Sequence, residues 1–341
     1  MIDTQLKKAA KFNTTEQKTL KEITEPVSDD LESFRSFYKR ALKTDVFLLD
    51  QMVRYLLKLK GKQIRPTIVF MSSRLFGNVT ERSYTAATMI ELLHTATLIH
   101  DDVVDEAEKR RGFLSFNKLW KNKASVLMGD FLLSRGLLIS IDRDEFGLLK
   151  VVSKAVKSMS EAELRQMKAA QLFNMNQERY FKVIKGKTAS LFSACCECGA
   201  IATSDDETIH EAMSEIGSNL GIAFQIRDDL FDYGTDDVGK PRRNDIKERK
   251  ITLPLIKAID NANIKQSYTI RKLMRKRNKT DKEIQQIVEF VRDHDGIRAS
   301  REQMMKYANR AIEQLNDLPV VDEQRRRDLT DLIEFIITRK K

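Results

Sequence analysis

Apolar residues in this chain recur at helical rather than at strand spacing, and the pattern predicts a series of long helices. In a helix, residues three and four apart share a face, so an apolar stripe of that period marks a buried side. No segment shows the strict alternation of a half-buried strand. The predicted helical segments are residues 31–59, 85–105, 125–140, 161–170, 177–203 and 212–233, followed by amphipathic helices from Pro254 to the C-terminus.

Two of these segments, residues 85–105 and 212–233, are apolar nearly all round, which is typical of helices inside a core. Residues 234–252 are polar and basic and contain Gly and Pro, so they predict a loop. Residues 1–25 have no strong apolar stripe and predict an N-terminal arm. The expected fold is all-α, with residues 26–341 forming one large helical bundle around a central cavity.

Composition agrees with this expectation and argues against some partners. Hydrophobic residues make up 41% of the 341 residues, with only 13 Gly and 5 Pro, as in a mostly helical globular protein. The net charge is +10, yet basic and acidic residues are interspersed, and no zinc-finger, RNA-binding or basic-zipper spacing is present. We therefore expect no nucleic-acid partner; a basic surface suits diphosphates or anionic lipid better.

Three cysteines, Cys195, Cys196 and Cys198, are crowded into one helical segment, too close together for ordinary disulfides. They predict buried thiols in a reduced, cytoplasmic protein. Residues 1–21 lack the apolar core of a signal peptide, and no uninterrupted apolar stretch reaches the length of a membrane span. The sequence thus predicts a soluble protein, for which peripheral membrane contact stays open.

The most informative pattern is a run of carboxylates that occurs twice, each time at the end of an apolar helix. The runs are Asp101-Asp102-Val103-Val104-Asp105 and Asp228-Asp229-Leu230-Phe231-Asp232. Residues four apart lie on one helix face, so each run presents two carboxylates in the same direction. A single run could be a solvated face, but two at the ends of buried helices are costly without a cation. Mg²⁺ prefers such oxygen ligands and is usually shared with substrate phosphates, so a diphosphate-binding Mg²⁺ site is predicted.

Basic and polar residues near the same helices could complete such a site. Arginine binds phosphate in a bidentate manner and lysine supplies a point charge, although each of these residues is weak evidence alone. His94 lies two turns before Asp101 and shares its face, so it could donate to a diphosphate, whereas His100 is expected to be a hydrogen-bonded core residue. The other candidates are Lys62, Arg65, Arg110, Arg111, Lys187 and Thr188.

Taken together, these motifs resemble the trans-polyprenyl diphosphate synthase family. The residues from His94 to His100 before the first run, and Arg110-Arg111-Gly112 after it, are similar to the family's first aspartate-rich motif. Residues 221–225 leading into the second run are similar to its second motif. Three further strings occur in the same order as in the family: Gly61-Lys62-Gln63-Ile64-Arg65-Pro66, Lys187-Thr188 and Thr252-Leu253-Pro254. The resemblance therefore covers roughly residues 59–256.

This resemblance implies a dimeric isoprenoid synthase fold that condenses an allylic diphosphate repeatedly with isopentenyl diphosphate. It implies that Asp101, Asp105 and Asp228 bind Mg²⁺, with Asp102, Asp229 and Asp232 as further ligands or their supports. It assigns the allylic diphosphate to Arg110, Lys187, Thr188 and Gln225, and isopentenyl diphosphate to Lys62, Arg65, His94 and Arg111. No protein base is evident; in the family the departing diphosphate is thought to take the proton.

The chain departs from the family pattern at two positions. Gln63 stands where the family often has Arg, which is expected to weaken isopentenyl diphosphate binding. Arg249 stands where the family usually has Gly, which puts the closed shape of its loop in question.

A terpene cyclase is the nearest alternative enzyme, but its second motif usually mixes Asn, Ser and Glu. A noncatalytic subunit of a heteromeric synthase would tend to lose the aspartates, which are intact here.

Product length should depend on the residues four and five positions before Asp101, which face the growing chain about one turn deeper. These are Thr97 and Ala96, both small, whereas short-chain members often have a large aromatic there. We therefore expect a long product, such as heptaprenyl or octaprenyl diphosphate, with Phe131 and Leu132 as candidates for the floor of the cavity. A short-chain farnesyl or geranylgeranyl diphosphate synthase remains the alternative.

Overall fold

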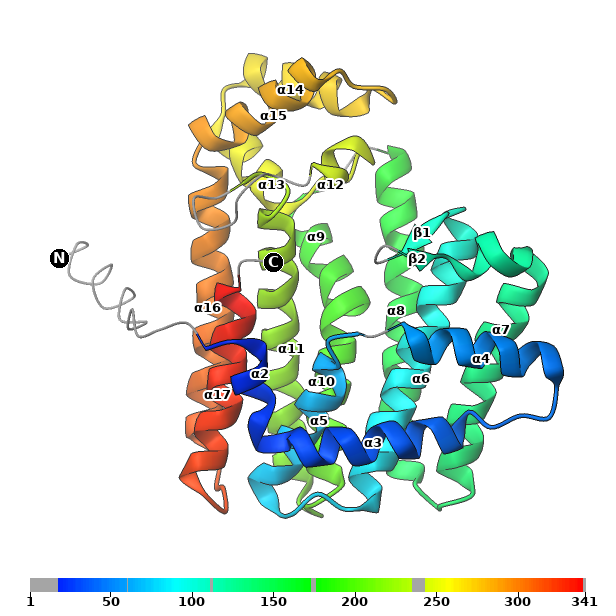
Figure 1. Cartoon of the computed structure of the whole chain (residues 1–341). Coiled ribbons are helices and arrows are strands. Elements are labelled where there is room, and N and C mark those ends of the chain that lie inside the picture. The colour runs from blue at the N-terminus through cyan, green and yellow to red at the C-terminus, as the bar shows by residue number, and fades with distance from the viewer. Residues whose placement is uncertain (1–17, 60, 111–112, 173–175, 235–242, 340–341) are drawn as a thin grey trace.

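Long helices standing side by side form the body of the protein (Figure 1). The computed structural model describes residues 18–59, 61–110, 113–172, 176–234 and 243–339, without the side chains of residues 109–110 and 170–172. In the first half the elements are α2 (Leu20–Thr24), the 3₁₀ turn η1 (Glu25–Val27), α3 (Ser28–Ala41), α4 (Phe47–Lys58), α5 (Ile64–Phe76), α6 (Glu81–Val104), β1 (Lys109–Arg110), β2 (Phe113–Leu114), α7 (Phe116–Ile141) and α8 (Phe146–Leu172).

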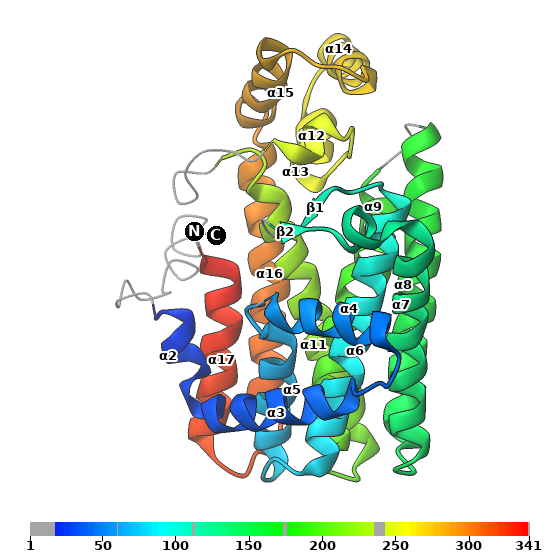
Figure 2. The same ribbon diagram turned by 45° about the vertical axis from the view of Figure 1, so that its right-hand side comes forward.

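The second half begins with α9 (Gln177–Ile184), which continues through a π-helical turn, η2 (Lys185–Ala189), into α10 (Ser190–Ile201). The remaining helices are α11 (Glu207–Leu230), α12 (Asn244–Lys247), α13 (Leu253–Asn261), α14 (Ile264–Arg275), α15 (Asp281–Asp293), α16 (Gly296–Asn316) and α17 (Glu323–Thr338). Helices α3 and α4 run across the upright helices, and α12 to α15 gather at one end of the bundle (Figures 1 and 2).

The predicted all-α architecture is confirmed, with small differences at the element boundaries. The segment predicted over residues 31–59 is two helices, because the chain leaves helical geometry between Ala41 and Phe47. A two-stranded antiparallel hairpin, Lys109–Arg110 with Phe113–Leu114, lies within the described residues although no strand was expected. The predicted loop over residues 234–252 contains the short helix α12. Of the predicted arm, residues 1–17 lie outside the described part, and α2 buries Ile23.

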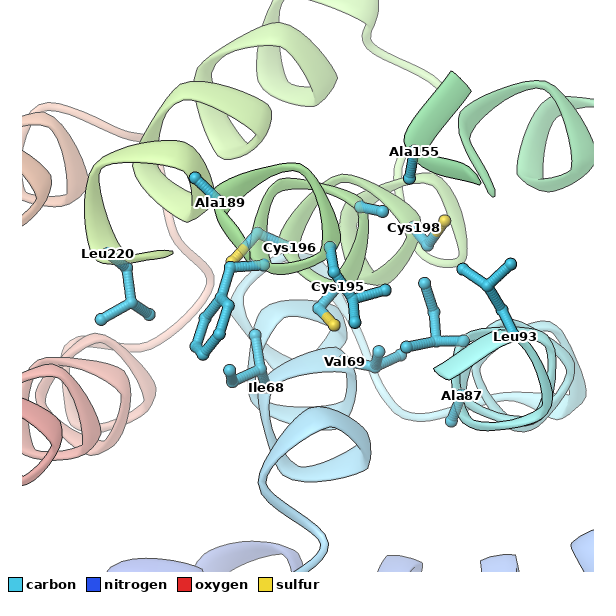
Figure 3. Packing of buried hydrophobic residues seen from close by; sticks show 14 of the residues in the cluster. Ile68, Val69, Ala87, Leu93, Ala155, Ala189, Cys195, Cys196, Cys198 and Leu220 are labelled. Carbon is cyan, nitrogen blue, oxygen red and sulfur yellow. The ribbon is translucent and has the colours of Figure 1, made fainter. Parts of the chain in front are cut away.

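Helix α10 is the centre of the core and packs against α5, α6, α8 and α11. Figure 3 shows the thiols of Cys195, Cys196 and Cys198 among apolar side chains such as Ile68 of α5 and Leu93 of α6. All three thiols are free and fully buried, as predicted, and burial raises the pKa of Cys196 to about 12. Such thiols are inert core residues rather than reactive ones. A second, smaller apolar cluster joins α12, α13, α14 and α15.

One long helix among the described residues has an unusually apolar composition. Helix α7 is long and apolar enough to cross a membrane by length and composition, and 28% of its most apolar window is buried. Asp130 and Arg135 interrupt the apolar sequence of α7, so the helix is not an uninterrupted apolar stretch of membrane-spanning length. After the irregular backbone at Lys121, its exposed apolar residues lie on one face of the helix: Val126, Leu127, Leu137, Leu138 and Ile141.

Candidate active site

Both carboxylate runs lie where their helices end, at the end of the bundle that also carries α12 (Figure 1). In the first run, Asp101 is half-buried, Asp102 is buried and Asp105 is exposed at the end of α6. In the second run, Asp228 is half-buried, whereas Asp229 and Asp232 are both buried. Each run thus offers both accessible carboxylates and buried ones, as a site open on one side requires.

The buried Asp229 is held by two side chains from different helices. Tyr180 of α9 donates its hydroxyl hydrogen to Asp229 Oδ2 at 2.6 Å, and Gln225 Nε2 donates to Oδ1 at 2.9 Å. Burial raises the pKa of the Asp229 carboxyl to about 8, and the nearby carboxylate of Asp245 acts in the same direction. The site therefore concentrates negative charge that a cation would stabilise.

Asp245, in α12, belongs to the same cluster. Its backbone N–H donates a hydrogen bond to the carboxylate of Asp232. Burial raises the pKa of the Asp245 carboxyl to about 6, and repulsion from Asp232 adds to this effect. The chain after α11 thus returns to place a further acid beside the second run.

Lys250 connects the two runs electrostatically. Burial tends to lower the pKa of Lys250, but a hydrogen bond to Glu248 at 2.6 Å raises it above its usual value. The carboxylates of Asp245, beside the second run, and of Asp105, in the first run, act in the same direction as Glu248. Lys250 therefore stays protonated near both runs, and its ammonium group could bind an anionic ligand there.

The π-helical turn η2 presents two of the predicted ligands. Thr188 donates its hydroxyl hydrogen to Gln225 Oε1 at 2.7 Å, and Gln225 in turn holds Asp229. Lys187 pairs with Glu163 and donates to Gln166 Oε1 at 3.1 Å. π-helical turns often occur at functional sites, because the extra residue turns the following side chains away from the face they would occupy in a regular α-helix. Here the shift brings Thr188 into the network of the second run.

A glycine permits this arrangement. A Cβ atom on Gly221 of α11 would lie only 2.5 Å from the Cα atom of Ala189, at the end of η2. Only a residue without a side chain allows the two backbones to approach this closely. Gly221 thereby sets the separation of the helices that carry Gln225 and Thr188.

Two cavities open among these residues. The first, called here the Lys187 cavity, has a volume of about 160 Å³ and is lined by Lys187, Thr188, Gln225, Asp229, Asp245 and Lys250, among others. The second, the His94 cavity, has a volume of about 560 Å³ and is lined by Gln63, His94, Asp102, Arg35 and apolar residues such as Leu98 and Ile99. Charged, polar and apolar residues line the first cavity, and the second combines polar groups with an apolar wall.

Four of the predicted diphosphate ligands line one or the other cavity. Lys187, Thr188 and Gln225, assigned to the allylic diphosphate, line the Lys187 cavity. His94, assigned to isopentenyl diphosphate, lines the His94 cavity. Lys62 and Arg65 have the same assignment and flank Gln63, which also lines this cavity; Lys62 is exposed and Arg65 is half-buried. The side chain of Arg110, and the whole of Arg111, lie outside the described residues.

The residues predicted to set product length are not part of either cavity wall. Ala96 is fully buried in α6, and Thr97 donates its hydroxyl hydrogen to the carbonyl of His94 at 2.9 Å. Phe131 is half-buried and packs against the main core from α7, beside the fully buried Leu132. Their role in product length stays a prediction.

The donor chemistry fits a hard divalent cation. The acids of the two runs supply only carboxylate oxygens, the ligands that Mg²⁺ prefers. Burial, together with repulsion from neighbouring carboxylates, raises the pKa of Asp229 and of Asp245, and a bound cation would favour the charged form of both. Among the described residues, no three acidic, His or Cys side chains already converge on one point. Mg²⁺ commonly takes one or two carboxylates and completes its shell with water and substrate phosphate, so a preformed cage is not required.

Residues outside the predicted set also take part. Tyr180, Asp245 and Lys250 all line the Lys187 cavity. Asp245 and Lys250 belong to a charged stretch, Asp245-Ile246-Lys247-Glu248-Arg249-Lys250, whose position in the chain gave the only signal. Tyr180 carries no motif, and only the fold brings it to Asp229.

Arg339, just beyond α17, was also missed. Its guanidinium pairs with the carboxylate of Asp228 and lies 4.4 Å from the centre of the Phe224 ring. Its backbone carbonyl accepts a hydrogen bond from Arg227 Nη2 at 2.9 Å. Arg339 thus anchors the C-terminal segment on the second run, and a metal ion bound by Asp228 would have to compete with this guanidinium.

We predict that Arg339→Gln strengthens divalent cation binding by about fivefold, since a pair of this exposure is worth on the order of 1 kcal/mol. Mn²⁺ binding to the substrate-free protein, followed by titration calorimetry, measures the change. Arg339→Lys keeps the positive charge and serves as the control, with affinity close to that of the unchanged protein. Equal or weaker Mn²⁺ binding by Arg339→Gln would show that the two cations do not compete.

Comparison with known proteins points to one family. The family model for polyprenyl synthetase matches residues 46–291. The chain is 33% identical over 302 residues to the octaprenyl diphosphate synthase of Escherichia coli (strain K12), covering 88% of this chain and 93% of the relative.

Solved structures give the same result. The decaprenyl diphosphate synthase of Rhodobacter capsulatus superposes with a TM-score of 0.88 at 31% identity, covering 95% of this chain and 100% of the other. A polyprenyl synthase from Caulobacter crescentus, solved with calcium and isoprenyl diphosphate, gives a TM-score of 0.85 at 28% identity over 96% of this chain and 100% of the other.

Proposed function

The chain belongs to the polyprenyl synthetase family, and we propose that it is a Mg²⁺-dependent prenyltransferase that makes a long-chain all-trans polyprenyl diphosphate. It would condense an allylic diphosphate repeatedly with isopentenyl diphosphate. The observation that carries the proposal is the pair of cavities beside the two aspartate runs, one lined by Lys187, Thr188 and Gln225 and the other by His94. A condensation of two diphosphates needs two such sites side by side.

The reaction breaks the C–O bond of the allylic diphosphate, joins its first carbon to the terminal alkene carbon of isopentenyl diphosphate, and releases a proton with the diphosphate. Asp101, Asp105 and Asp228 would hold Mg²⁺, supported by Asp102, Asp229 and Asp232. Bound Mg²⁺ would neutralise the negative charge that develops on the leaving diphosphate. The Caulobacter relative, solved with calcium and isoprenyl diphosphate, supports a divalent cation in this family.

The protein's own groups contribute binding, orientation and exclusion of water. Lys187, Thr188 and Lys250 present donors in the Lys187 cavity, where an allylic diphosphate would be bound and oriented. The apolar wall of the His94 cavity, including Leu98 and Ile99, keeps water from an electron-poor allylic carbon. Deeper apolar space beyond Ala96 would receive the growing chain.

We further propose a homodimer joined through α7. The apolar face formed by Val126, Leu127, Leu137, Leu138 and Ile141 is 39–56% exposed in the single chain. Exposed aliphatic side chains gathered on one face of a helix are typical of a protein interface, and here the exposed polar residues Asp130 and Ser134 lie among them. It also offers an explanation other than membrane insertion for the apolar character of α7.

Product analysis of the purified chain alone tests these proposals. Incubation with labelled isopentenyl diphosphate, an allylic primer and Mg²⁺ should yield heptaprenyl or octaprenyl diphosphate, and sedimentation should give the mass of two chains. Labelled product only after addition of a second, different subunit would replace the homomeric enzyme by a heteromeric one. A cyclic hydrocarbon product would identify a terpene cyclase instead.

We also propose a cytoplasmic location, on the basis of three reduced, buried thiols. Fractionation of cells that express the chain should recover it inside the cell, in the soluble or the peripheral membrane fraction. Recovery from the medium or from an oxidising compartment would contradict this location.

Gln63 stands where the family often has Arg, and a neighbouring guanidinium lies beside it. Arg35 of α3 donates to Gln63 Oε1 from Nε at 3.1 Å and from Nη2 at 2.9 Å. Both residues line the His94 cavity, so Arg35 brings a positive charge to a site that lacks the usual one. Gln63 is held in a left-handed conformation, with φ of 49°, at the start of α5.

We predict that Arg35→Gln raises the KM for isopentenyl diphosphate about 10-fold and changes the KM for the allylic primer little, because charged hydrogen bonds to phosphate are worth roughly 1.5–3 kcal/mol. Steady-state kinetics with each substrate varied in turn measure both values. Arg40→Gln, on the same helix but outside the His94 cavity, is the matched control. Equal rises in both KM values would contradict a role for Arg35 at one substrate only.

A further inference from the structure

The segment from Ala262 to Thr280 carries charge of one sign only. Its 19 residues contain seven Lys or Arg and no Asp or Glu, although acidic residues are frequent in the chain as a whole. The segment comprises α14 and the loop that leads to α15. Such a run stands apart from the rest of the surface, where the two signs are interspersed.

Helix α14 is anchored on one side and open on the other. Ile270 and Met274 are buried in the smaller apolar cluster, which fixes the orientation of the helix. On the opposite side Ile264 is 91% exposed and Tyr268, one turn later, is 68% exposed. Lys265 and Lys272 are exposed on the same side of the helix. The open face therefore combines a large aliphatic residue, an aromatic residue and lysines.

This face lies at the end of the bundle that carries the candidate active site (Figures 1 and 2). Lys279, in the loop after α14, is close enough to Arg249 for that charge to lower its pKa, in addition to the larger effect of burial. Arg249 in turn lines the Lys187 cavity. Basic residues thus lie between α14 and the neighbourhood of the site, where Glu283 of α15 pairs with Lys276 and offsets part of their charge.

We propose that the open face of α14, with Ile264, Tyr268, Lys265 and Lys272, docks on the surface of an anionic lipid bilayer. Lysines near an anionic membrane are attracted to its headgroups, and exposed aliphatic and aromatic residues enter the headgroup boundary. The inference rests on the proposed function, because a polyprenyl diphosphate is amphipathic and has to pass from the site to an apolar phase. Docking would place the site next to that phase.

An acidic protein is the main alternative occupant, and the two exposed side chains argue for lipid. A purely electrostatic partner would need the lysines but would gain little from Ile264 at 91% exposure. A bilayer uses both kinds of residue, with tyrosine at the polar boundary and isoleucine below it. The short, rigidly packed helix presents both at the same time.

Co-sedimentation of the full chain with vesicles tests the proposal. Vesicles of phosphatidylcholine with one-third phosphatidylglycerol should bind the chain, pure phosphatidylcholine vesicles should bind it at least 10-fold more weakly, and added salt should weaken binding. The double variant Lys265→Gln/Lys272→Gln should lose about 10-fold in partition, and Ile264→Ser/Tyr268→Ser a similar amount. Lys306→Gln/Arg310→Gln, which removes the same charge from exposed positions of α16, should bind as the unchanged protein does.

Three results would overturn the proposal: equal binding to neutral and anionic vesicles, equal losses in the α14 and α16 variants, or retention by immobilised polyglutamate without vesicle binding. Prenyl transfer with a water-soluble primer in the absence of vesicles is measured on the same samples. Vesicle binding without transfer would reject the proposed function and leave the docking surface standing. Transfer without vesicle binding would reject only the docking surface.

Discussion

Replacing Asp101 or Asp228 with alanine is expected to lower turnover about 100-fold or more while leaving the helical content unchanged. Each carboxylate lies in the last turn of a core helix, where it is accessible enough to meet a ligand. Removing one group that stabilises developing charge at a reacting centre commonly costs about 100- to 1,000-fold in rate. Turnover at saturating Mg²⁺ and both substrates, with circular dichroism on the same samples, measures the effect.

Two controls separate loss of metal binding from loss of structure. Asp260→Ala removes an exposed aspartate from α13, away from both runs, and should keep full activity. Asp228→Asn keeps the shape of the side chain that faces Arg339, so it should fold as the unchanged protein does and still lose activity. Near-normal turnover in a folded Asp101 or Asp228 variant would remove that residue from the proposed metal site.

The fold was largely predictable because its helices are long and their buried faces are wide. The all-round apolar pattern before Asp101 predicted a core helix, and α6 buries most of its residues from Thr85 to Ile99. The boundaries were harder, since local backbone geometry decides them. Lys121, with φ of 68° inside α7, and the π-turn at Lys185–Ala189 interrupt regular helices without any Pro, so the hydrophobic period gave no signal.

The sequence indicated the part of the candidate site that consists of consecutive residues. It did not indicate the contacts between residues that are far apart in the chain. The spacing of the aspartates in both runs drew attention to them, whereas Lys187 and Thr188 were assigned only through the family resemblance. Tyr180 reaches Asp229 across 49 positions of sequence, and Arg339 reaches Asp228 across 111. Such pairs depend on how α9 and α17 pack, which no local pattern contains.

Arg249, which stands where the family usually has Gly, adopts a backbone conformation that is typical of glycine. Its φ of 62° lies in the left-handed region that glycine adopts without strain, so Arg249 takes the backbone shape expected of the family's glycine. The cost of this conformation for a residue with a side chain is roughly 1 kcal/mol. In return the guanidinium lines the Lys187 cavity, where it adds positive charge near a predicted diphosphate.

Product length should depend on the bulk of one buried side chain. Ala96 is fully buried in α6, five positions before Asp101, so it lies about 7.5 Å deeper along the helix than the predicted metal ligand. A phenyl ring is much bulkier than this methyl group, so it would obstruct a chain that grows past this position. Relatives at similar identity include both octaprenyl and geranylgeranyl diphosphate synthases, so family membership alone does not determine the length.

Ala96→Phe is expected to shift the main product from heptaprenyl or octaprenyl diphosphate to farnesyl or geranylgeranyl diphosphate, with turnover largely kept. The ring would close the path of the growing chain, while the carboxylates and the Lys187 cavity stay unchanged. Chromatography of the dephosphorylated labelled products measures the distribution. Ala96→Ser adds polarity without bulk and should leave the long product in place, and thermal unfolding of both variants shows whether the ring is tolerated in the core. If folded Ala96→Phe still makes the long product, or if the unchanged enzyme already stops at farnesyl diphosphate, the chain does not grow past Ala96.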